Sequence, residues 1–246
     1  SSIAQIINEF LQSNSNNSEN QLITTNKPKN LVGRKAIVTS GPTIEAIDPI
    51  RYLTNYSSGR QGHVIAKALS AQGAKTILIS GPTQLPDPEG VSVKHIKSAA
   101  EMMSACEESL PADIVICAAA VADWRVANPN IDKIKKNGIL PTLELVENPD
   151  ILQQISQHVK DRPHLVIGFA AETKDLITNA QTKLSKKGCD WIVANDVSPE
   201  AETFGSKKNR VHIVSKDGVE TWPTLTKDII GQKLSARIAT FLENLS

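Results

Sequence analysis

The chain has 246 residues, of which 40% are hydrophobic and 22% charged, and 27 basic against 26 acidic side chains leave a formal net charge of +1. This composition indicates a globular protein with a sizeable core, and the near-zero charge argues against nucleic acid as a partner. No stretch approaches the roughly 18 consecutive apolar residues of a membrane span, and no signal peptide is recognisable. The three cysteines are odd in number and far apart, which favours free thiols and a cytoplasmic location.

The first residues differ in composition from the rest of the chain. Residues 1–12 carry apolar side chains at helical spacing, whereas residues 13–32 are mostly Ser, Asn, Thr, Lys and Gln. Such a polar tract cannot offset its ordering entropy, so we expect a helix, a flexible linker and then one domain over residues 33–246. Because no Met precedes it, the helix is interpreted as the remnant of a longer polypeptide; an artificial leader would look similar.

Short runs rich in Val and Ile alternate with helical patterns along the domain. The predicted strands cover residues 35–40, 75–80, 91–96, 113–118, 165–169 and 190–194, and the predicted helices cover residues 62–72, 99–110, 149–159 and 173–187. Residues 210–215 and 219–222 flank Asp217-Gly218 and predict a hairpin, and a last helix carries an apolar stripe from Ile230 to Leu245. We expect an α/β fold: a Rossmann-like, doubly wound, mostly parallel sheet with helices on both faces and a C-terminal β-hairpin plus helix.

The long loop after the first predicted strand is the first candidate for ligand binding, because ligands of open α/β sheets bind at the carboxyl ends of the strands. Gly41, Ser57, Ser58 and Gly59 supply hydroxyls, bare backbone amides and a helix N-terminus, which suit phosphate oxygens. A plain turn before a helix explains the same residues equally well. The loop has no Gly-Lys-Ser/Thr and is therefore not a Walker P-loop.

The loop after the fourth strand contains Cys117, Ala118, Ala119 and Asp123. Small residues there let a flat ligand lie against the backbone. Asp123 could accept a hydrogen bond from an exocyclic amine or hold a cation. A tight turn with Asp123 as a helix cap is the alternative interpretation.

Lysines and an aromatic residue follow at later strand ends. The basic run Lys133-Ile134-Lys135-Lys136 would ordinarily be a solvated surface, but it follows the loop that carries Asp123, where a cation would meet a phosphate. Phe169 ends the fifth strand and could stack on a base or ribose. Lys183 and Lys187 are spaced to share one face of the next helix. Together these loop ends predict a nucleotide site.

Six motifs occur in order along the chain. They are Ile47-Asp48-Pro49-Ile50-Arg51-Tyr52 leading into Asn55-Tyr56-Ser57-Ser58-Gly59, then Ala119-Ala120-Val121-Ala122-Asp123, Lys133-Ile134-Lys135-Lys136, Asn148-Pro149-Asp150-Ile151, Gly168-Phe169-Ala170-Ala171-Glu172-Thr173 and Ala194-Asn195-Asp196. Together they resemble the phosphopantothenoylcysteine synthetases, the second half of bifunctional coenzyme A biosynthesis flavoproteins. The resemblance covers about residues 33–241.

The resemblance implies a ligase that joins 4′-phosphopantothenate and L-cysteine. In the bacterial enzymes, CTP activates the carboxylate as an acyl-cytidylate with release of pyrophosphate, and the cysteine amine then displaces CMP. Lys133 would match the lysine of the activation step. Asn55 would match the asparagine of the second step, where it would donate to the developing oxyanion. Mg²⁺ is expected with CTP, but the sequence names no metal ligand.

The resemblance also implies a binding site, an assembly and a missing half. The implied CTP site consists of Cys117, Ala118, Ala119, Asp123, Lys133, Pro149, Asp150, Ile151, Leu152, Phe169, Lys183 and Lys187. The Arg51–Gly59 segment resembles a dimerisation motif and implies a homodimer with Asn55 at the interface. The flavin-binding decarboxylase half of the parent proteins is not in this chain, which is therefore expected to bind no flavin.

Two residues depart from the family pattern. The family's first loop usually reads Gly-Gly-Thr, whereas here it reads Gly41-Pro42-Thr43, and Pro42 removes a backbone donor. Ser40 replaces a common alanine. We expect a modest effect on phosphate binding.

Two other functions compete with the ligase. A nicotinamide-dependent reductase would need an acidic residue after the second strand, which ends Ile79-Ser80-Gly81, and a Lys four residues after Tyr56, where Arg60 stands. A non-catalytic nucleotide-binding module is the other alternative. Asn55 and Lys133 argue against it, and turnover would decide.

Overall fold

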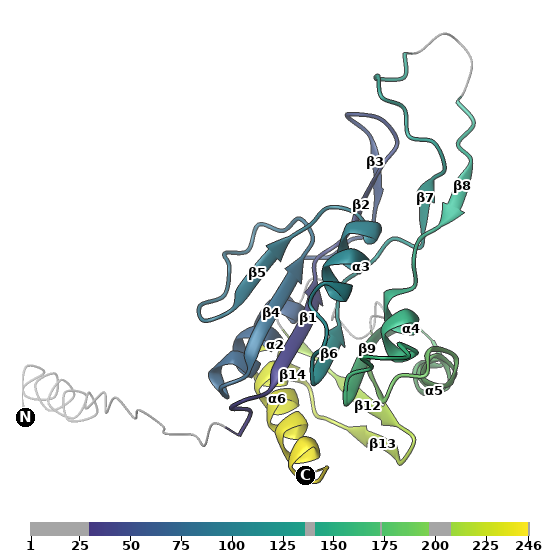
Figure 1. The fold of residues 1–246 in the computed structure, drawn as a ribbon. Helices are drawn as coiled ribbons and strands as arrows, with labels where there is room; N and C mark the ends of the chain where they lie inside the picture. Colours follow the sequence, from purple (N-terminus) through teal and green to yellow (C-terminus); the bar gives the residue numbers. More distant parts are fainter. Residues whose placement is uncertain (1–29, 136–140, 173, 197–207, 246) are drawn as a thin grey trace, which may run out of the picture.

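The computed structural model describes residues 30–135, 141–172, 174–196 and 208–245 of the chain (Figure 1). An eight-stranded sheet forms its centre, with the strand order β13-β12-β10-β9-β6-β1-β4-β5. The parallel strands are β1 (Lys35–Ser40), β4 (Lys75–Ser80), β5 (Ser92–His95), β6 (Ile114–Cys117), β9 (Leu165–Glu172) and β10 (Trp191–Asp196). β12 (Val211–Ser215) and β13 (Gly218–Thr221) extend the sheet as an antiparallel hairpin.

The order of the parallel strands is that of doubly wound nucleotide-binding folds. The chain runs outward from β1 to β4 and β5, returns to β6 beside β1, and continues outward to β9 and β10. The direction of winding therefore reverses between β1 and β6. In this architecture the reversal point is where ligands usually bind.

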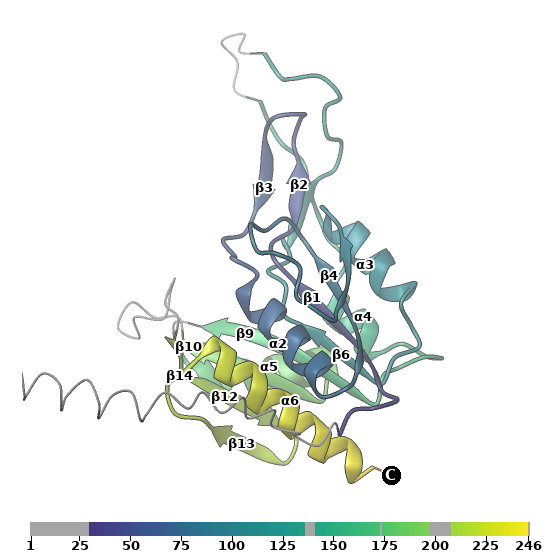
Figure 2. The same ribbon diagram turned by 90° about the vertical axis from the view of Figure 1, so that its left-hand side faces the viewer.

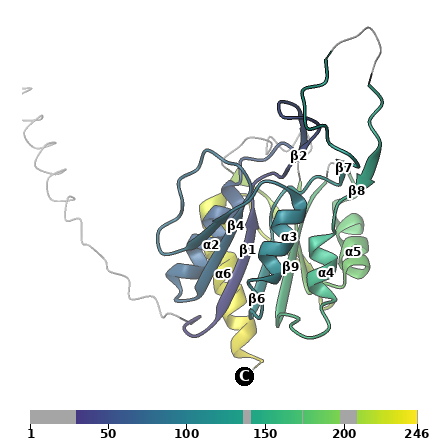
Figure 3. The same ribbon diagram turned by 45° about the horizontal axis from the view of Figure 1, so that its top comes forward.

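Helices cover both faces of the sheet, because successive side chains of each buried strand point to opposite sides. α2 (Arg60–Ala71) and α6 (Lys227–Glu243) pack on one face, against side chains such as Val38 of β1 (Figure 2). α3 (Ala99–Glu107), α4 (Ile151–Ser156) and α5 (Leu176–Lys187) pack on the other, against side chains such as Ile37 (Figure 3). This two-sided burial explains the continuous apolar runs of the strands.

Local chemistry sets the ends of several helices. The side chains of Ser98, Asp150 and Thr226 each accept a hydrogen bond from a first-turn amide of α3, α4 and α6, respectively. α5 ends at Gly188, whose φ of 70° is left-handed.

The predicted fold is confirmed, with shifted boundaries. β9 continues to Glu172, and α5 begins at Leu176 rather than at residue 173. Leu31, which the sequence assigned to the linker, is fully buried in the core, and its amide donates to the Gln72 carbonyl at 3.0 Å. The predicted helix at residues 1–12 and the linker up to residue 29 lie outside the described residues. In the part of the chain that is described, no helix is long and apolar enough to cross a membrane.

Two ribbons that the sequence did not predict project from the sheet (Figure 1). β2 (Ile44–Ala46) pairs with β3 (Tyr52–Thr54), and β7 (Trp124–Val126) pairs with β8 (Leu145–Glu147). We call residues 44–54 and the described part of residues 124–147 the arm. A third small pair, β11 (Lys208–Asn209) with β14 (Leu225–Thr226), precedes α6.

Candidate functional site

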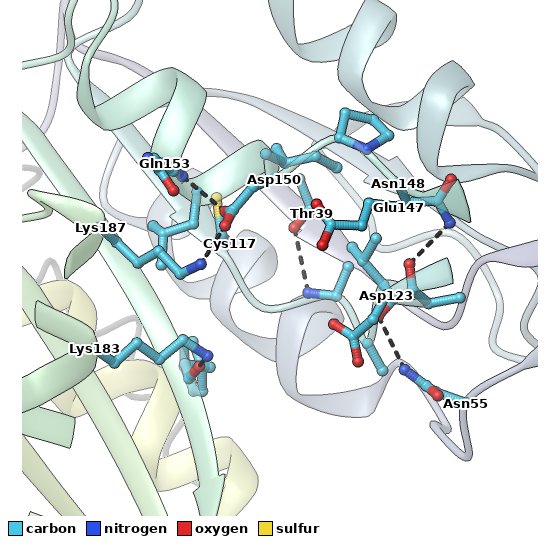
Figure 4. A pocket seen from close by; sticks show the side chains of 18 of the residues that line it. Thr39, Asn55, Cys117, Asp123, Glu147, Asn148, Asp150, Gln153, Lys183 and Lys187 are labelled. Atoms are coloured by element: carbon cyan, nitrogen blue, oxygen red, sulfur yellow. Dashed lines mark hydrogen bonds and ion pairs between the residues drawn. The ribbon is translucent and has the colours of Figure 1, made fainter. Parts of the chain in front are cut away.

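A pocket of about 800 Å³ opens at the carboxyl end of the sheet, beside β6, β9, α4 and α5 (Figure 4). Figure 4 shows Lys183 and Lys187 on one side, Asn55 and Asp123 on the other, and Cys117 between them. The lining residues are Thr39, Asn55, Cys117, Ala119, Ala120, Val121, Ala122, Asp123, Trp124, Glu147, Asn148, Pro149, Asp150, Ile151, Leu152, Gln153, Phe169, Ala171, Lys183, Lys186 and Lys187.

The pocket lies beside the reversal point because main-chain hydrogen bonds join the segments that follow β1 and β6. The Ala120 amide donates to the Gly41 carbonyl at 2.9 Å, and the Thr43 amide donates to the Ala120 carbonyl at 3.4 Å. Pro42 forms a parallel bridge with Ala120 in the same segment. This contact occupies the gap between β1 and β6, so the open space lies on the β9 side. Pro42 is not among the lining residues of the pocket.

Two threonine hydroxyls hold the segment that follows β6 through hydrogen bonds to its amides. Thr39 Oγ1 accepts from the Ala119 amide at 3.2 Å, and Thr43 Oγ1 accepts from the Ala122 amide at 3.0 Å. Both threonine side chains belong to residues that are almost fully buried. A small-residue segment without bulky side chains would otherwise gain little from packing, so these bonds supply its order.

Two asparagine amides fix the carbonyls of the same segment. Asn55 Nδ2 donates to the Val121 carbonyl, and Asn148 Nδ2 donates to the Ala122 carbonyl, both at 2.9 Å. The Asn148 amide also donates to the Asp123 carbonyl at 2.9 Å. Asn55 belongs to the segment after β3, and it reaches the pocket through this bond. The backbone facing the pocket is therefore held in one arrangement before any ligand binds.

The opposite wall of the pocket is basic. Lys183 Nζ donates to the Phe169 carbonyl at 2.7 Å, and Lys187 forms an ion pair with Asp150, whose other oxygen caps α4. Burial, and next the charge of Lys187, lower the pKa of Lys183 below its ordinary value. Two ammonium groups near the same wall favour a polyanionic ligand, which would relieve their mutual repulsion.

Cys117 offers no reactive thiol to this pocket. Burial raises its pKa well above the usual range, and the nearby Cys106, Cys189 and Asp150 act in the same direction. A thiol that stays protonated is a poor nucleophile. Cys117 can therefore contribute its backbone, but not sulfur chemistry, to this pocket.

Most of the predicted nucleotide residues come together in the pocket. The residues from the predicted site that line it are Asn55, Cys117, Ala119, Asp123, Pro149, Asp150, Ile151, Leu152, Phe169, Lys183 and Lys187. The predicted residues outside the lining are Ala118, Lys133, Gly41, Ser57, Ser58 and Gly59. The lining also includes residues that were not assigned to the site from the sequence, among them Thr39, Glu147, Asn148, Gln153 and Lys186. The sequence feature that could have indicated Thr39 as a site residue is its position directly after the apolar run Ala36-Ile37-Val38 of the first predicted strand.

One local alternative raised by the sequence is wrong. Asp123 caps no helix, since it precedes the strand β7 and lines the pocket. Residues 133–135 form neither a helical turn nor a strand. Lys136 lies outside the described residues.

The position of Lys133 on the arm is set by an ionic cluster around Asp48. The fully buried carboxylate of Asp48 accepts from the amides of Ile50 and Arg51 at 2.9 and 2.8 Å, and from the Ile134 amide at 3.2 Å. It also accepts from Arg51 Nε and Nη2 at 2.9 and 2.6 Å, and Arg51 Nη2 donates to the Ile134 carbonyl at 2.7 Å. Both main-chain groups of Ile134 are thus tied to the turn between β2 and β3.

The hydrogen bonds of this cluster determine the charge of Asp48. Burial raises the pKa of Asp48, but the amides of Ile50 and Arg51, the Arg51 guanidinium and the Ile134 amide together outweigh it. The pKa therefore lies well below the usual range, and the carboxylate stays ionised at any physiological pH.

We expect Asp48→Asn to release residues 133–135 from the turn, because an amide cannot accept from every donor around it and places its own N–H against them. Tryptic cleavage after Lys133 and Lys135 should become about tenfold faster than in the unaltered protein. Asp132→Asn, which alters an exposed carboxylate in the same segment, is the matched control. Equal cleavage of the two variants would contradict this role of Asp48.

The pH dependence follows from the lowered pKa. The carboxylate stabilises the folded chain fully above its unfolded pKa of 3.8, and this contribution is lost as the pH falls through the lower folded value. The difference in melting temperature between the protein and Asp48→Asn should therefore be constant from about pH 8 to about pH 5 and narrow below about pH 4.

The chain matches a protein-family model described as "DNA/pantothenate metabolism flavoprotein C-terminal domain" over residues 31–242. It is 44% identical over 207 residues to the coenzyme A biosynthesis bifunctional protein CoaBC of Vibrio cholerae, covering 82% of this chain and 51% of the relative. The CoaBC protein of Escherichia coli strain K12 is 40% identical over 208 residues, covering 83% of this chain and 51% of the relative. The chain thus spans about half the length of these relatives.

A solved structure agrees with this assignment. The crystal structure of the C-terminal domain of coenzyme A biosynthesis bifunctional protein CoaBC matches with a TM-score of 0.74 and 37% identity, covering 88% of this chain and 99% of that one. The chain therefore belongs to the family of DNA/pantothenate metabolism flavoprotein C-terminal domains.

Proposed function

We propose that this domain is a phosphopantothenate–cysteine ligase of coenzyme A biosynthesis, which joins 4′-phosphopantothenate and L-cysteine at the expense of CTP. The observation that carries the proposal is the pocket, where a backbone fixed by hydrogen bonds faces a wall with two lysines. The first feature suits the edge of a base, and the second suits a polyphosphate. Family membership and the coenzyme A biosynthesis name of the relatives support the same assignment.

The first step activates the carboxylate of 4′-phosphopantothenate. Its oxygen attacks the α-phosphate of CTP, forming an acyl-cytidylate as the bond to pyrophosphate breaks. This step depends on alignment and on neutralising charge at the phosphates. We assign the polyphosphate to Lys183 and Lys187 and the α-phosphate to Lys133. The last role requires the arm to bring Lys133 closer to the pocket, whose lining includes Trp124 and Glu147 of the arm but not Lys133.

The second step forms the amide. The cysteine amine attacks the acyl carbon, and the bond to CMP breaks. Asn55 stands at the pocket with one N–H bound to the Val121 carbonyl. Its second N–H is the donor that we assign to the oxyanion of the tetrahedral intermediate.

Mg²⁺ fits this site as a companion of CTP rather than as a resident ion. Among the described residues, no group of three or more His, Cys, Asp or Glu side chains could hold a metal ion. Magnesium keeps several waters and binds chiefly to substrate phosphates in such sites. We assign the ion to the CTP phosphates, where it would neutralise charge.

We further propose that Asp123, which lines the pocket, accepts a hydrogen bond from the base of CTP.

The experiment that tests the ligase function is pyrophosphate release by the purified chain with CTP, Mg²⁺ and 4′-phosphopantothenate, with and without L-cysteine. We expect release with CTP, sustained turnover only when cysteine is present, and much slower release with ATP. Absence of release with either nucleotide, from a folded protein, would reject the ligase and leave the non-catalytic module. Tight NADPH binding measured by fluorescence would instead favour the reductase.

Variants at two residues separate the two steps. Lys133→Gln should lower pyrophosphate release by at least about 100-fold, because charge at the α-phosphate is no longer neutralised. Asn55→Asp should still release one equivalent of pyrophosphate and accumulate acyl-cytidylate, detectable by mass spectrometry after a single turnover. Lys135→Gln, an exposed neighbour, is the control. If Asn55→Asp bound CTP normally but failed to activate the carboxylate, this division of roles would be wrong.

We further propose a homodimer through the Arg51–Gly59 segment. Several large apolar side chains of the arm and of the segment after β3 are exposed, among them Ile50 at 59%, Tyr56 at 96% and Ile131 at 92%. Large apolar side chains exposed close together in the sequence and fold are typical of an interface. A cytoplasmic location and a decarboxylase half in the parent protein stay predictions.

Sedimentation velocity tests the dimer. We expect a dimer for the unaltered chain and a monomer for the double variant Ile50→Asp/Tyr56→Asp, because buried carboxylates would be unpaired at the interface. Val159→Asp alters a side chain that is fully exposed away from the arm and should stay dimeric. A monomeric unaltered chain at micromolar concentration would refute the proposal.

A further inference from the structure

Thr39 places a hydroxyl at the floor of the pocket, near the carboxyl end of β1. The residue is 1% exposed, yet it lines the pocket, and its partner on the neighbouring strand β6 is Cys117. Side chains alternate along β1, so Thr39 shares with Ile37 the face that α3, α4 and α5 cover. Because a buried, β-branched side chain has little rotational freedom, the hydroxyl is held in place before a ligand binds.

The Thr39 hydroxyl keeps its own proton. A hydroxyl offers one donor and two acceptor positions, and Thr39 Oγ1 uses one acceptor position for the Ala119 amide at 3.2 Å. Several other buried hydroxyls give their proton to a carbonyl, such as Ser109 Oγ, which donates to the Ala105 carbonyl at 2.7 Å. In the part of the chain that the structure describes, no acceptor takes the proton of Thr39. A nearly buried donor in the lining of a pocket is therefore left for an atom of the ligand.

Thr39 lies toward the middle of the pocket. Figure 4 shows it, with Cys117, between the two lysines of the basic wall and Asn55. In the proposed ligase, the lysines hold the polyphosphate and Asn55 serves the acyl carbon. The α-phosphorus is bonded to the pyrophosphate group before the carboxylate attacks and to the acyl oxygen afterwards. It therefore reacts between these two walls, in the part of the pocket where Thr39 stands.

Thr39 differs from the neighbouring groups in being a hydroxyl donor that belongs to the central sheet. The Cys117 thiol is a weaker donor than a hydroxyl. Lys133 lies on the arm and outside the lining of the pocket. Thr39 thus stands at the pocket before the arm moves, and a donor held by the sheet needs no reorganisation when the phosphate reacts.

We propose that Thr39 is a catalytic residue of the activation step, in which its hydroxyl donates a hydrogen bond to a non-bridging oxygen of the α-phosphate. The carboxylate oxygen of 4′-phosphopantothenate forms a bond to the α-phosphorus, the bond to pyrophosphate breaks, and the hydroxyl keeps its proton throughout. The hydrogen bond strengthens as negative charge gathers on the α-phosphate, so it lowers the barrier more than it tightens CTP binding. This inference rests on the proposed ligase function.

Thr39→Val and Thr39→Ser form the test, because the first removes the hydroxyl while keeping the shape and the second keeps the hydroxyl. In the pyrophosphate-release assay, Thr39→Val should lower kcat about 30-fold and change the KM of CTP by less than about threefold. Thr39→Ser should stay within about threefold of the unaltered chain in kcat. Equal losses in the two variants would show that the methyl group matters rather than the hydroxyl, and would overturn the proposal.

Thr43→Val is the matched control for order in the segment after β6. Thr43 is also buried, and its Oγ1 accepts from the Ala122 amide at 3.0 Å, but it lies outside the lining of the pocket. The two valine variants should lower the melting temperature by similar amounts, because each leaves one amide without its acceptor. The loss of kcat in Thr43→Val should be at least about fivefold smaller than in Thr39→Val. Equal losses would show that Thr39 acts only by holding Ala119.

A phosphorothioate nucleotide tests the contact with the α-phosphate. CTPαS carries sulfur in place of one non-bridging α-oxygen, and sulfur is a weak hydrogen-bond acceptor. One of its two diastereomers should react more slowly than CTP in the unaltered chain. Thr39→Val should reduce that rate ratio at least about fivefold, because the lost hydrogen bond no longer distinguishes oxygen from sulfur. An unchanged ratio for both diastereomers would overturn the contact.

The same assay separates this inference from the ligase function on which it rests. Absence of pyrophosphate release from the folded, unaltered chain would reject both. Release at equal rates by the unaltered chain and by Thr39→Val would reject the role of Thr39 alone.

Discussion

The position of the candidate site depends on one main-chain contact, the bridge between the segments that follow β1 and β6. In doubly wound sheets the gap between these two strands usually receives the ligand. Here Ala120 bonds to Gly41 and Thr43 across that gap. The space that remains lies toward β9, where α4 and α5 supply a helix cap and lysines. The strand order of a doubly wound sheet is thus kept, and the pocket extends from the end of β1 past β6 toward β9.

The bridge also explains how residues that are distant in the sequence come to serve one pocket. Thr39 and Thr43 flank the end of β1, and their hydroxyls hold amides of the segment after β6. Asn55 and Asn148 hold its carbonyls from the other side. Since donors and acceptors of the segment are both engaged, a ligand would meet a surface that does not need to be ordered on binding, and less entropy is lost.

The strands of the central sheet could be predicted from the sequence, but the short strands of the arm could not. Strands such as β1 carry long apolar runs, because one residue such as Ile37 faces one helical layer and its neighbour Val38 faces the other. β2, β3, β7 and β8 are three residues each, too short for any periodicity to appear. Asp48 was visible as part of a motif, but its contact with Ile134 spans 86 positions and follows no local rule. Most residues that the family resemblance assigns to the CTP site line the pocket, whereas the contacts of Thr39 and Asn148 are visible only in the structure.

The way in which the arm leaves the body has a mechanical consequence. β2 begins directly after Thr43, and β7 begins two residues after Ala122. The Ala122 amide donates a hydrogen bond to Thr43 Oγ1 at 3.0 Å. A movement of the arm at its base would therefore act on the same bond that orders the floor of the pocket. A displacement of the arm would be transmitted through the Thr43–Ala122 bond to the main chain that lines the pocket.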